Sequence, residues 1–286
     1  MLDIQGVQHI FTTDSGQRIE ALRDVDLNIP SGQIVCLVGP SGCGKSTLLK
    51  IIGGFFNPTN GQVRAGADES QLRPVTGPGV DRGVVFQQPN LYPWLNVAEN
   101  VALGSTFTGS SAQRKEAEEL VELVGLSAAK GRYPHELSGG MQQRAQIARV
   151  LATSPETVLM DEPFSAVDPF TREQLQAELL RIWHRYQPTI IFVTHSVEEA
   201  ILLGHRVVVM APNPGHIIDD VTVPPEVRAS NLPENSENSE DALSREALQA
   251  RLRDFTVNPQ FVELRHHLTE AITSAHQNRA AELHIA

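Results

Sequence analysis

Cysteine, basic residues and long apolar runs are all scarce in this sequence, and each scarcity excludes a class of protein. Only two cysteines occur in 286 residues, Cys36 and Cys43, and they lie too close along the chain to staple a domain. This usage indicates a reducing compartment. Lysine and arginine number 23 against 34 acidic residues, which gives a formal net charge of −11. Because a nucleic-acid surface needs a basic footprint, this balance argues against such a partner.

No stretch of the chain stays apolar for the length of a membrane-spanning helix. The longest apolar runs, such as Ile34–Val38 and Val207–Ala211, have the length of buried parallel strands. Residues 1–5 also lack the basic and then apolar layout of a signal peptide. If the protein works at a membrane, we therefore expect other chains to cross it.

Strands that alternate with helices predict an α/β fold with a parallel sheet. The expected strands lie at residues 34–38, 157–160, 189–193 and 207–210. Helical spacing of apolar residues predicts helices at about 45–53, 112–125, 139–152 and 171–187. Residues 1–35 alternate loosely, which is typical of an antiparallel opening.

The composition changes after residue 225. Residues 234–241 read ENSENSED, an acidic and polar segment that cannot bury a core. We therefore expect one large domain over residues 1–225, a flexible linker over 226–242, and a helical extension over 243–286 that is interrupted near Asn258-Pro259.

A glycine-rich loop is the clearest motif, because it fits G-x-x-x-x-G-K-[ST] at every fixed position and stands between an expected strand and helix. It reads Gly39-Pro40-Ser41-Gly42-Cys43-Gly44-Lys45-Ser46, followed by Thr47. Glycines let backbone N–H groups turn toward phosphate oxygens, Lys45 supplies a cation, and Ser46 offers a hydroxyl to Mg²⁺. The motif predicts binding of ATP with Mg²⁺. The alternative is a glycine-rich turn with an incidental lysine.

Two acids, Asp161 and Glu162, end the expected strand at 157–160. Ligands of open parallel sheets bind at the carboxyl ends of strands, where paired carboxylates are costly unless a cation or substrate uses them. Asp161 is the candidate for holding Mg²⁺, and Glu162 for deprotonating the water that attacks the γ-phosphate. The alternative is a helix N-cap before Pro163.

Further segments resemble the ABC ATPase family, in matching order and spacing over residues 1–225. Leu137-Ser138-Gly139-Gly140-Met141 is similar to the LSGGQ signature, with Met141 in place of the usual glutamine. Gln87 resembles the Q-loop glutamine and residues 165–168 the D-loop. His195, directly after an expected strand, resembles the switch histidine. In isolation each has a plainer interpretation: a helix start, an edge-of-strand amide, a structural histidine.

The resemblance implies a RecA-like core with an antiparallel β-subdomain and an inserted helical subdomain at about 88–152. It also implies two ATPase subunits, in all expectation identical, closed head-to-tail around two ATPs. Ser138, Gly139 and Gly140 of one subunit then face the phosphate loop of the other. His195 contacts the γ-phosphate, Gln87 senses Mg²⁺ and the attacking water, and Phe11 stacks on adenine. With Met141 in the signature, we expect an enzyme whose activity is reduced or retuned but not lost.

Within the family, the sequence resembles the nitrate, sulfonate and taurine importer group. The similarity lies in residues 77–87, 91–101 and 258–265. It implies ATP hydrolysis coupled to uptake of a small solute such as a sulfonate, taurine or nitrate, at the cytoplasmic face of a bacterial membrane. Residues Gln88–Val97 are then expected to receive a transmembrane permease subunit, and a periplasmic or extracellular solute-binding protein takes part indirectly. Trp94 could instead belong to the core of the helical subdomain.

Two other functions are alternatives to this one. A soluble ABC ATPase of the DNA-repair or ribosome-associated type needs a coiled-coil insertion or a second cassette, and the spacing from Gln87 to Glu162 leaves no room for an insertion. A regulatory nucleotide-binding protein without turnover is disfavoured by intact Lys45, Asp161 and His195. Four C-terminal histidines lack acid or cysteine partners at metal-binding spacing, so we expect a solvated face: His266, His267, His276 and His284.

Overall fold

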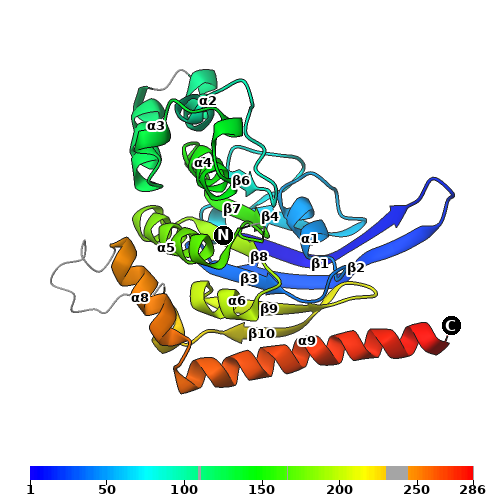
Figure 1. Cartoon of the computed structure of the whole chain (residues 1–286). Coiled ribbons are helices and arrows are strands. Elements are labelled where there is room, and N and C mark those ends of the chain that lie inside the picture. Colours follow the sequence, from blue (N-terminus) through cyan, green and yellow to red (C-terminus); the bar gives the residue numbers. More distant parts are fainter. Residues whose placement is uncertain (109–110, 166, 230–243, 286) are drawn as a thin grey trace.

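The computed structural model describes residues 1–108, 111–165, 167–229 and 244–285, and its centre is a six-stranded sheet (Figure 1). The strand order is β10-β9-β3-β8-β7-β6. All neighbouring pairs are parallel except β9 with β10. The strands are β3 (Ile34–Val38), β6 (Arg82–Val85), β7 (Thr157–Asp161), β8 (Thr189–Val193), β9 (Arg206–Ala211) and β10 (His216–Thr222).

Burial on both faces explains why β3 is a continuous apolar run. Ile34, Cys36 and Val38 point into one hydrophobic cluster, and Val35 and Leu37 point into another on the opposite face. Successive side chains of a strand alternate between faces, so a strand covered on both sides has no polar positions. Five residues are therefore enough to seat the strand at the centre of the sheet.

A second, antiparallel sheet covers one of these faces together with helix α1 (Lys45–Ile52). Its order is β2-β1-β4-β5. The strands are β1 (Leu2–Thr12), β2 (Arg18–Ile29), β4 (Asn60–Ala65) and β5 (Arg73–Pro74). The long β1–β2 hairpin projects from the body of the molecule (Figure 1).

Helices cover the other face and extend beyond it. Three of them pack together above the β6–β7 edge: α2 (Val97–Thr108), α3 (Ser111–Leu123) and α4 (Gly139–Leu151) (Figure 1). Helices α5 (Pro169–Tyr186) and α6 (Val197–Leu203) connect β7 to β8 and β8 to β9. Single 3-10 turns lie at Glu69–Gln71, Ser127–Ala129, Pro134–Glu136 and Pro225–Val227.

The chain ends in two helices, α8 (Arg245–Phe255) and α9 (Pro259–Ile285), separated at Asn258. Helix α8 packs on α5, and α9 runs along α6 and β9 (Figure 1). Val227 and Ala229 are fully buried, so the packed domain extends past residue 225. The remainder of the expected linker, residues 230–242, lies outside the described residues.

This architecture confirms the α/β, RecA-like fold predicted from the sequence. Two details differ from expectation. Strand β7 includes Asp161, so this acid belongs to the sheet itself. Strand β10 was not expected, because it alternates half-buried and exposed residues at the antiparallel edge and has no apolar run. Within the described ranges, no helix is both long and apolar enough to traverse a bilayer.

Candidate functional site

The predicted site residues follow three strands that are neighbours in the sheet. The phosphate loop follows β3, Glu162 follows β7, and His195 lies two residues beyond β8. The sheet order β3-β8-β7 places these loops side by side, because parallel strands end at the same edge. Segments about 120 and 30 residues apart in the sequence thus form one site.

The phosphate loop needs glycine at two positions where the backbone is left-handed and closely packed. At Gly39 (φ 148°) a Cβ would lie 2.3 Å from the Met210 carbonyl oxygen. At Gly44 (φ 92°), which precedes α1, it would lie 2.5 Å from Leu22 Cδ2. A side chain at either position would move the loop. Gly42 also has a left-handed backbone (φ 82°) but faces open space, so its Cα side is free for a ligand.

Lys45 is buried and folds back over the loop. Its Nζ donates to the carbonyl oxygens of Gly39 (2.8 Å) and Pro40 (3.2 Å). The buried Cys43 thiol lies 3.6 Å from the same nitrogen. Burial raises the pKa of Cys43, and the Lys45 charge opposes this shift. The hydrogen bonds that the described residues make to this buried ammonium come from neutral carbonyls and a thiol, so a phosphate ligand would supply a direct counter-anion.

Ser46 and Asp161 meet at the place where Mg²⁺ is expected. The Ser46 hydroxyl donates to Asp161 Oδ1 at 2.9 Å, across the gap between α1 and the end of β7. Burial raises the pKa of Asp161, and the Glu162 charge adds to this, whereas the Ser46 hydrogen bond opposes it. A hydroxyl and a desolvated carboxylate are oxygen ligands of the type that Mg²⁺ takes, so these residues fit the metal.

Glu162 lies in a strained turn directly after β7. Its backbone is left-handed (φ 47°), which is uncommon for a residue with a side chain, and its N–H donates to Val193 O at 2.9 Å. Gln87 Nε2 donates to Glu162 Oε2 (3.3 Å) and to Ser165 Oγ (3.2 Å). The Ser165 hydroxyl in turn donates to Glu162 O at 2.9 Å.

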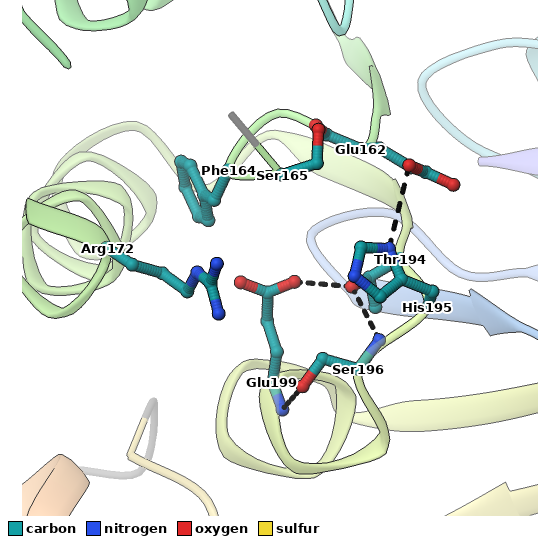
Figure 2. A pocket seen from close by; sticks show the side chains of 8 residues that line it. All are labelled: Glu162, Phe164, Ser165, Arg172, Thr194, His195, Ser196 and Glu199. Carbon is teal, nitrogen blue, oxygen red and sulfur yellow. Dashed lines mark hydrogen bonds and ion pairs between the residues drawn. The ribbon is translucent and has the colours of Figure 1, made fainter. Parts of the chain in front are cut away.

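His195 faces Glu162 across the mouth of a small pocket (Figure 2). Its Nδ1 lies 3.6 Å from Glu162 Oε2, and its side chain is 64% exposed. The structure thus brings Gln87, Glu162 and His195 together. Of the segment resembling a D-loop, Ala166 lies outside the described residues, and Asp168 caps α5 by accepting from the Thr171 N–H at 3.0 Å.

The segment resembling the signature lies at a different part of the chain's surface. Ser138 caps α4 by accepting from the Met141 N–H at 3.3 Å. Gly140 packs against α5, where a Cβ would lie 2.5 Å from Thr171 Cγ2. Helix α4 packs on α2, α3, β6 and α5, whereas the phosphate loop precedes α1 on the other side of the sheet (Figure 1). Ser138 and Gly139 are exposed.

Phe11, near the end of β1, belongs to an aromatic cluster of the β-subdomain. Its ring lies 4.5 Å from His9 and 5.7 Å from Phe56, both edge-on, measured between centroids. The side chain is 37% exposed. The side chain is therefore partly open to solvent, and its ring contacts are with His9 and with Phe56 after α1.

Several residues of the site were missed by the sequence interpretation. Thr194 and Glu199 line the pocket beside His195 in Figure 2, and both are buried. The available signal was polar residues flanking the histidine and one helical turn beyond it. Another is Asn100, fully buried in α2, whose amide organises the loop from Tyr92 to Asn96.

Two of the C-terminal histidines contact acids, one partner lying on a distant strand and the other one helical turn away on the same helix. His267 Nε2 lies 2.7 Å from Asp219 Oδ2 of β10, and His266 Nδ1 lies 3.3 Å from Glu270 Oε2. In the part of the chain that the structure describes, no group of three His, Cys, Asp or Glu side chains is arranged to hold a metal ion.

Comparisons with known proteins identify the family of the chain. Residues 22–165, about half of the chain, match the family model described as ABC transporter. The chain is 41% identical to the taurine import ATP-binding protein TauB of Jannaschia sp. (strain CCS1) over 92% of this chain and 91% of that protein. It is 42% identical to the nitrate import ATP-binding protein NrtD of Synechocystis sp. (strain ATCC 27184 / PCC 6803 / Kazusa) over 82% and 85%.

Among solved structures, the chain is similar to the ATP-binding cassette MJ0796 in a dimeric, post-hydrolysis state bound to ADP and Pi. The TM-score is 0.68 at 33% identity, over 78% of this chain and 99% of that one. These relatives confirm the resemblance to the nitrate, sulfonate and taurine group. With its fold, its phosphate loop and these relatives, the chain belongs to the ABC transporter family, as an ATP-binding and ATP-hydrolysing subunit.

Proposed function

We propose that two copies of this chain hydrolyse ATP with Mg²⁺ to energise import of a small anion, through permease subunits to which the chain binds at the cytoplasmic face of the membrane. The observation that carries the proposal is the meeting of Glu162, Gln87 and His195 beside a glycine loop that contains a buried lysine. The names of the taurine and nitrate importers among the relatives support import as the direction.

Lys45 and the loop N–H groups are assigned to the phosphates of ATP. The Lys45 ammonium exchanges the carbonyl oxygens of Gly39 and Pro40 for phosphate oxygens. The negative charge of the phosphates then offsets the free-energy cost of burying the ammonium. Ser46 and Asp161 are assigned to Mg²⁺, and Gln87 is assigned to sense the bound metal ion. When bound, the metal ion neutralises charge that develops on the phosphates.

Glu162 is assigned to the attacking water. Its carboxylate accepts the water proton, while Gln87 and His195 orient the carboxylate through contacts with its Oε2. The left-handed turn at Glu162 aims the side chain away from the strand, toward the loop after β8. His195 is exposed enough to contact the γ-phosphate directly, and Phe11 offers one ring face to adenine.

The exposed N-terminus of α4 supports a head-to-tail dimer. Ser138 and Gly139 point to solvent at a positive helix end, a place that favours an anion. Within one chain α4 packs on α2, α3 and α5, away from the phosphate loop. An ATP phosphate that contacts the N-terminus of α4 would therefore be bound by the phosphate loop of a second copy. The dimeric state of the similar cassette MJ0796 supports the same arrangement.

The loop from Gln88 to Val97 is proposed to receive the permease. Trp94 is 69% exposed and Tyr92 is 41% exposed, which favours the docking interpretation over a core position for Trp94. Arg149 stacks over Tyr92 at 5.6 Å, and the Asn100 amide holds the loop through four hydrogen bonds. A rigid aromatic platform beside Gln87 suits the docking of a short helix.

ATP hydrolysis by the full-length chain, wild type beside Glu162→Gln, tests the proposal. We expect the substitution to lower kcat at least about 100-fold while ATP binding persists and dimers accumulate, because proton acceptance is lost and the cradle is kept. Glu156→Gln, an exposed acid at the opposite end of β7, is the matched control and should leave kcat unchanged. Hydrolysis by Glu162→Gln at the wild-type rate would contradict the assignment.

Cargo is tested separately, in proteoliposomes with the permease and solute-binding protein. We expect taurine or another small sulfonate to stimulate ATP hydrolysis and to accumulate inside, and nitrate to be the next candidate. If neither a sulfonate nor nitrate stimulates hydrolysis by the assembled transporter, the anion proposal is wrong, although the ATPase assignment stands.

A further inference from the structure

A buried carboxylate beside His195 takes no part in the chemistry described above. Glu199, in the first turns of α6, is only 6% exposed. Its Oε2 accepts from the Thr194 hydroxyl at 2.5 Å, and its Oε1 accepts from Gln176 Nε2 at 3.0 Å. Figure 2 shows the carboxylate pointing toward the loop that carries His195 and not toward solvent.

These contacts hold the backbone on both sides of the histidine. The Thr194 hydroxyl, which donates to Glu199, also accepts from the Ser196 N–H at 3.1 Å. The Ser196 hydroxyl accepts from the Glu199 N–H at 3.2 Å. The residues before and after His195 are thus joined to one carboxylate and to the helix that carries it (Figure 2).

The histidine itself depends on this backbone. Its side chain is 64% exposed, and its Nδ1 lies 3.6 Å from Glu162 Oε2. An exposed side chain with so little packing takes its position from its main chain. Thr194 is well placed to set that position, since it is 2% exposed and its N–H donates to Leu37 O of β3, the strand that leads to the phosphate loop.

The same carboxylate faces α5, the helix that begins at Asp168. Gln176 and Arg172 lie one turn apart on α5. The Gln176 amide donates to Glu199, and Figure 2 shows the Arg172 guanidinium pointing toward the Glu199 carboxylate. The Arg172 guanidinium also donates to Val167 O at 3.4 Å, in the segment just before the helix. One buried group therefore connects the loop after β8 with the segment that precedes α5.

Stability alone gives little reason for a charge here. Burial raises the pKa of Glu199, and the hydrogen bonds from Thr194 and Gln176 and the charge of Arg172 oppose the shift. A buried charged network is often no more stable than apolar residues of the same volume. Its advantage is geometric, because it fixes donors and acceptors in one arrangement.

We propose that Glu199 is a positioning residue for ATP hydrolysis: it sets the backbone around His195 and ties it, through Gln176 and Arg172, to the segment at Val167–Asp168. The proposal rests on the role assigned to His195 above. It follows that a displacement of the segment before α5 moves His195 relative to Glu162. The competing interpretation is that Glu199 merely attaches α6 to α5.

A double-mutant cycle on the full-length chain separates the two interpretations. We expect Glu199→Gln to lower kcat about tenfold with the KM for ATP changed less than about twofold, because phosphate binding by Lys45 is untouched. In a His195→Ala background the same substitution should lower kcat less than about twofold, because its target is gone. An equal loss in both backgrounds would falsify the proposal, since a structural role does not depend on His195.

Matched variants keep the test decisive. Glu198→Gln, the exposed neighbour that pairs with Arg265, should leave kcat unchanged.

If Glu199→Gln does not fold, Thr194→Val and Thr194→Ser replace it in the same cycle. Thr194→Val removes the hydroxyl and should lower kcat about tenfold, whereas Thr194→Ser keeps a hydroxyl and should restore kcat to within about threefold of wild type. Equal rates for Val and Ser would overturn the proposal, as would a His195→Ala variant with wild-type kcat. In that last case the loss of activity in Glu162→Gln would still stand.

Discussion

Charged contacts join distant elements in two regions, the nucleotide edge of the six-stranded sheet and the C-terminal helices α8 and α9. The contacts differ in burial and therefore in what they contribute. At the edge the groups are buried or half-buried: Lys45 on loop carbonyls, Ser46 on Asp161, and Thr194 on Glu199. In the tail the ion pairs are exposed, as in Arg253–Glu173, where the side chains are 60% and 36% exposed.

The tail is attached by buried apolar side chains and not by those ion pairs. Leu248 and Leu252 of α8 and Phe261 and Leu268 of α9 are at most 2% exposed. Exposed pairs contribute little because water and salt screen them, whereas each buried side chain contributes about 1.5–3 kcal/mol. Polar contacts therefore position groups at the edge, and apolar contacts position the tail.

The largest expected effect is at the edge. Replacing Lys45 by Ala removes the buried cation of the phosphate loop and should lower kcat about 100- to 1000-fold, the usual loss for one electrostatic donor in a closed site. Lys115→Ala is the control: this lysine is exposed and lies on α3, in the helical subdomain. Phosphate release measures both. A Lys45→Ala rate above a tenth of the wild-type rate would contradict the view that buried polar contacts at the nucleotide edge control hydrolysis.

In the tail, the largest effect should come from an apolar residue. Phe261→Ala leaves a cavity under α9 and should destabilise its docking by about 3 kcal/mol, whereas Val262→Ala, 41% exposed, should change stability by less than about 0.5 kcal/mol. Hydrogen exchange of the α9 amides reports the docking directly. Equal protection in the two variants would show that the anchor is elsewhere.

Acid should destabilise the six-stranded sheet through a histidine that lies at the edge opposite the nucleotide edge. Burial, with the charges of Arg228 and His184, lowers the pKa of His205 in front of β9 to about 4. The unfolded chain then binds a proton more readily, so stability that is complete above about pH 6.5 is lost as pH falls toward 4, by about 2 kcal/mol. Urea midpoints from pH 7 to 4.5 should reveal this loss, and His205→Asn should reduce it.

The smallest effect is expected from an ion pair of the tail. Arg253→Ala should change the free energy of unfolding by about 0.5 kcal/mol or less, and less still in high salt. A double-mutant cycle with Glu173→Ala measures the coupling. A coupling above about 1.5 kcal/mol would mean that this pair behaves like the buried contacts of the edge.

Much of the site could be predicted because its residues stand in short motifs next to apolar strands. The phosphate loop, Asp161, Glu162 and His195 follow β3, β7 and β8, and parallel strands bring their ends together. Glu199 and Thr194 were missed because nothing in their spacing distinguishes a buried, bonded carboxylate from an exposed one. The contact of His267 with Asp219 was missed because its partner lies 48 residues away on an edge strand.

The sequence by itself determined the fold class, the family and the chemical groups of the site, since period-two and helical patterns, glycines and strand-end acids are local features. Only the tertiary structure decided that Trp94 lies at the surface, that Phe11 joins the ring cluster of His9 and Phe56, and that α9 docks along α6 and β9. These outcomes depend on which distant surfaces meet, because burial and pairing are properties of the packed chain and not of any one segment.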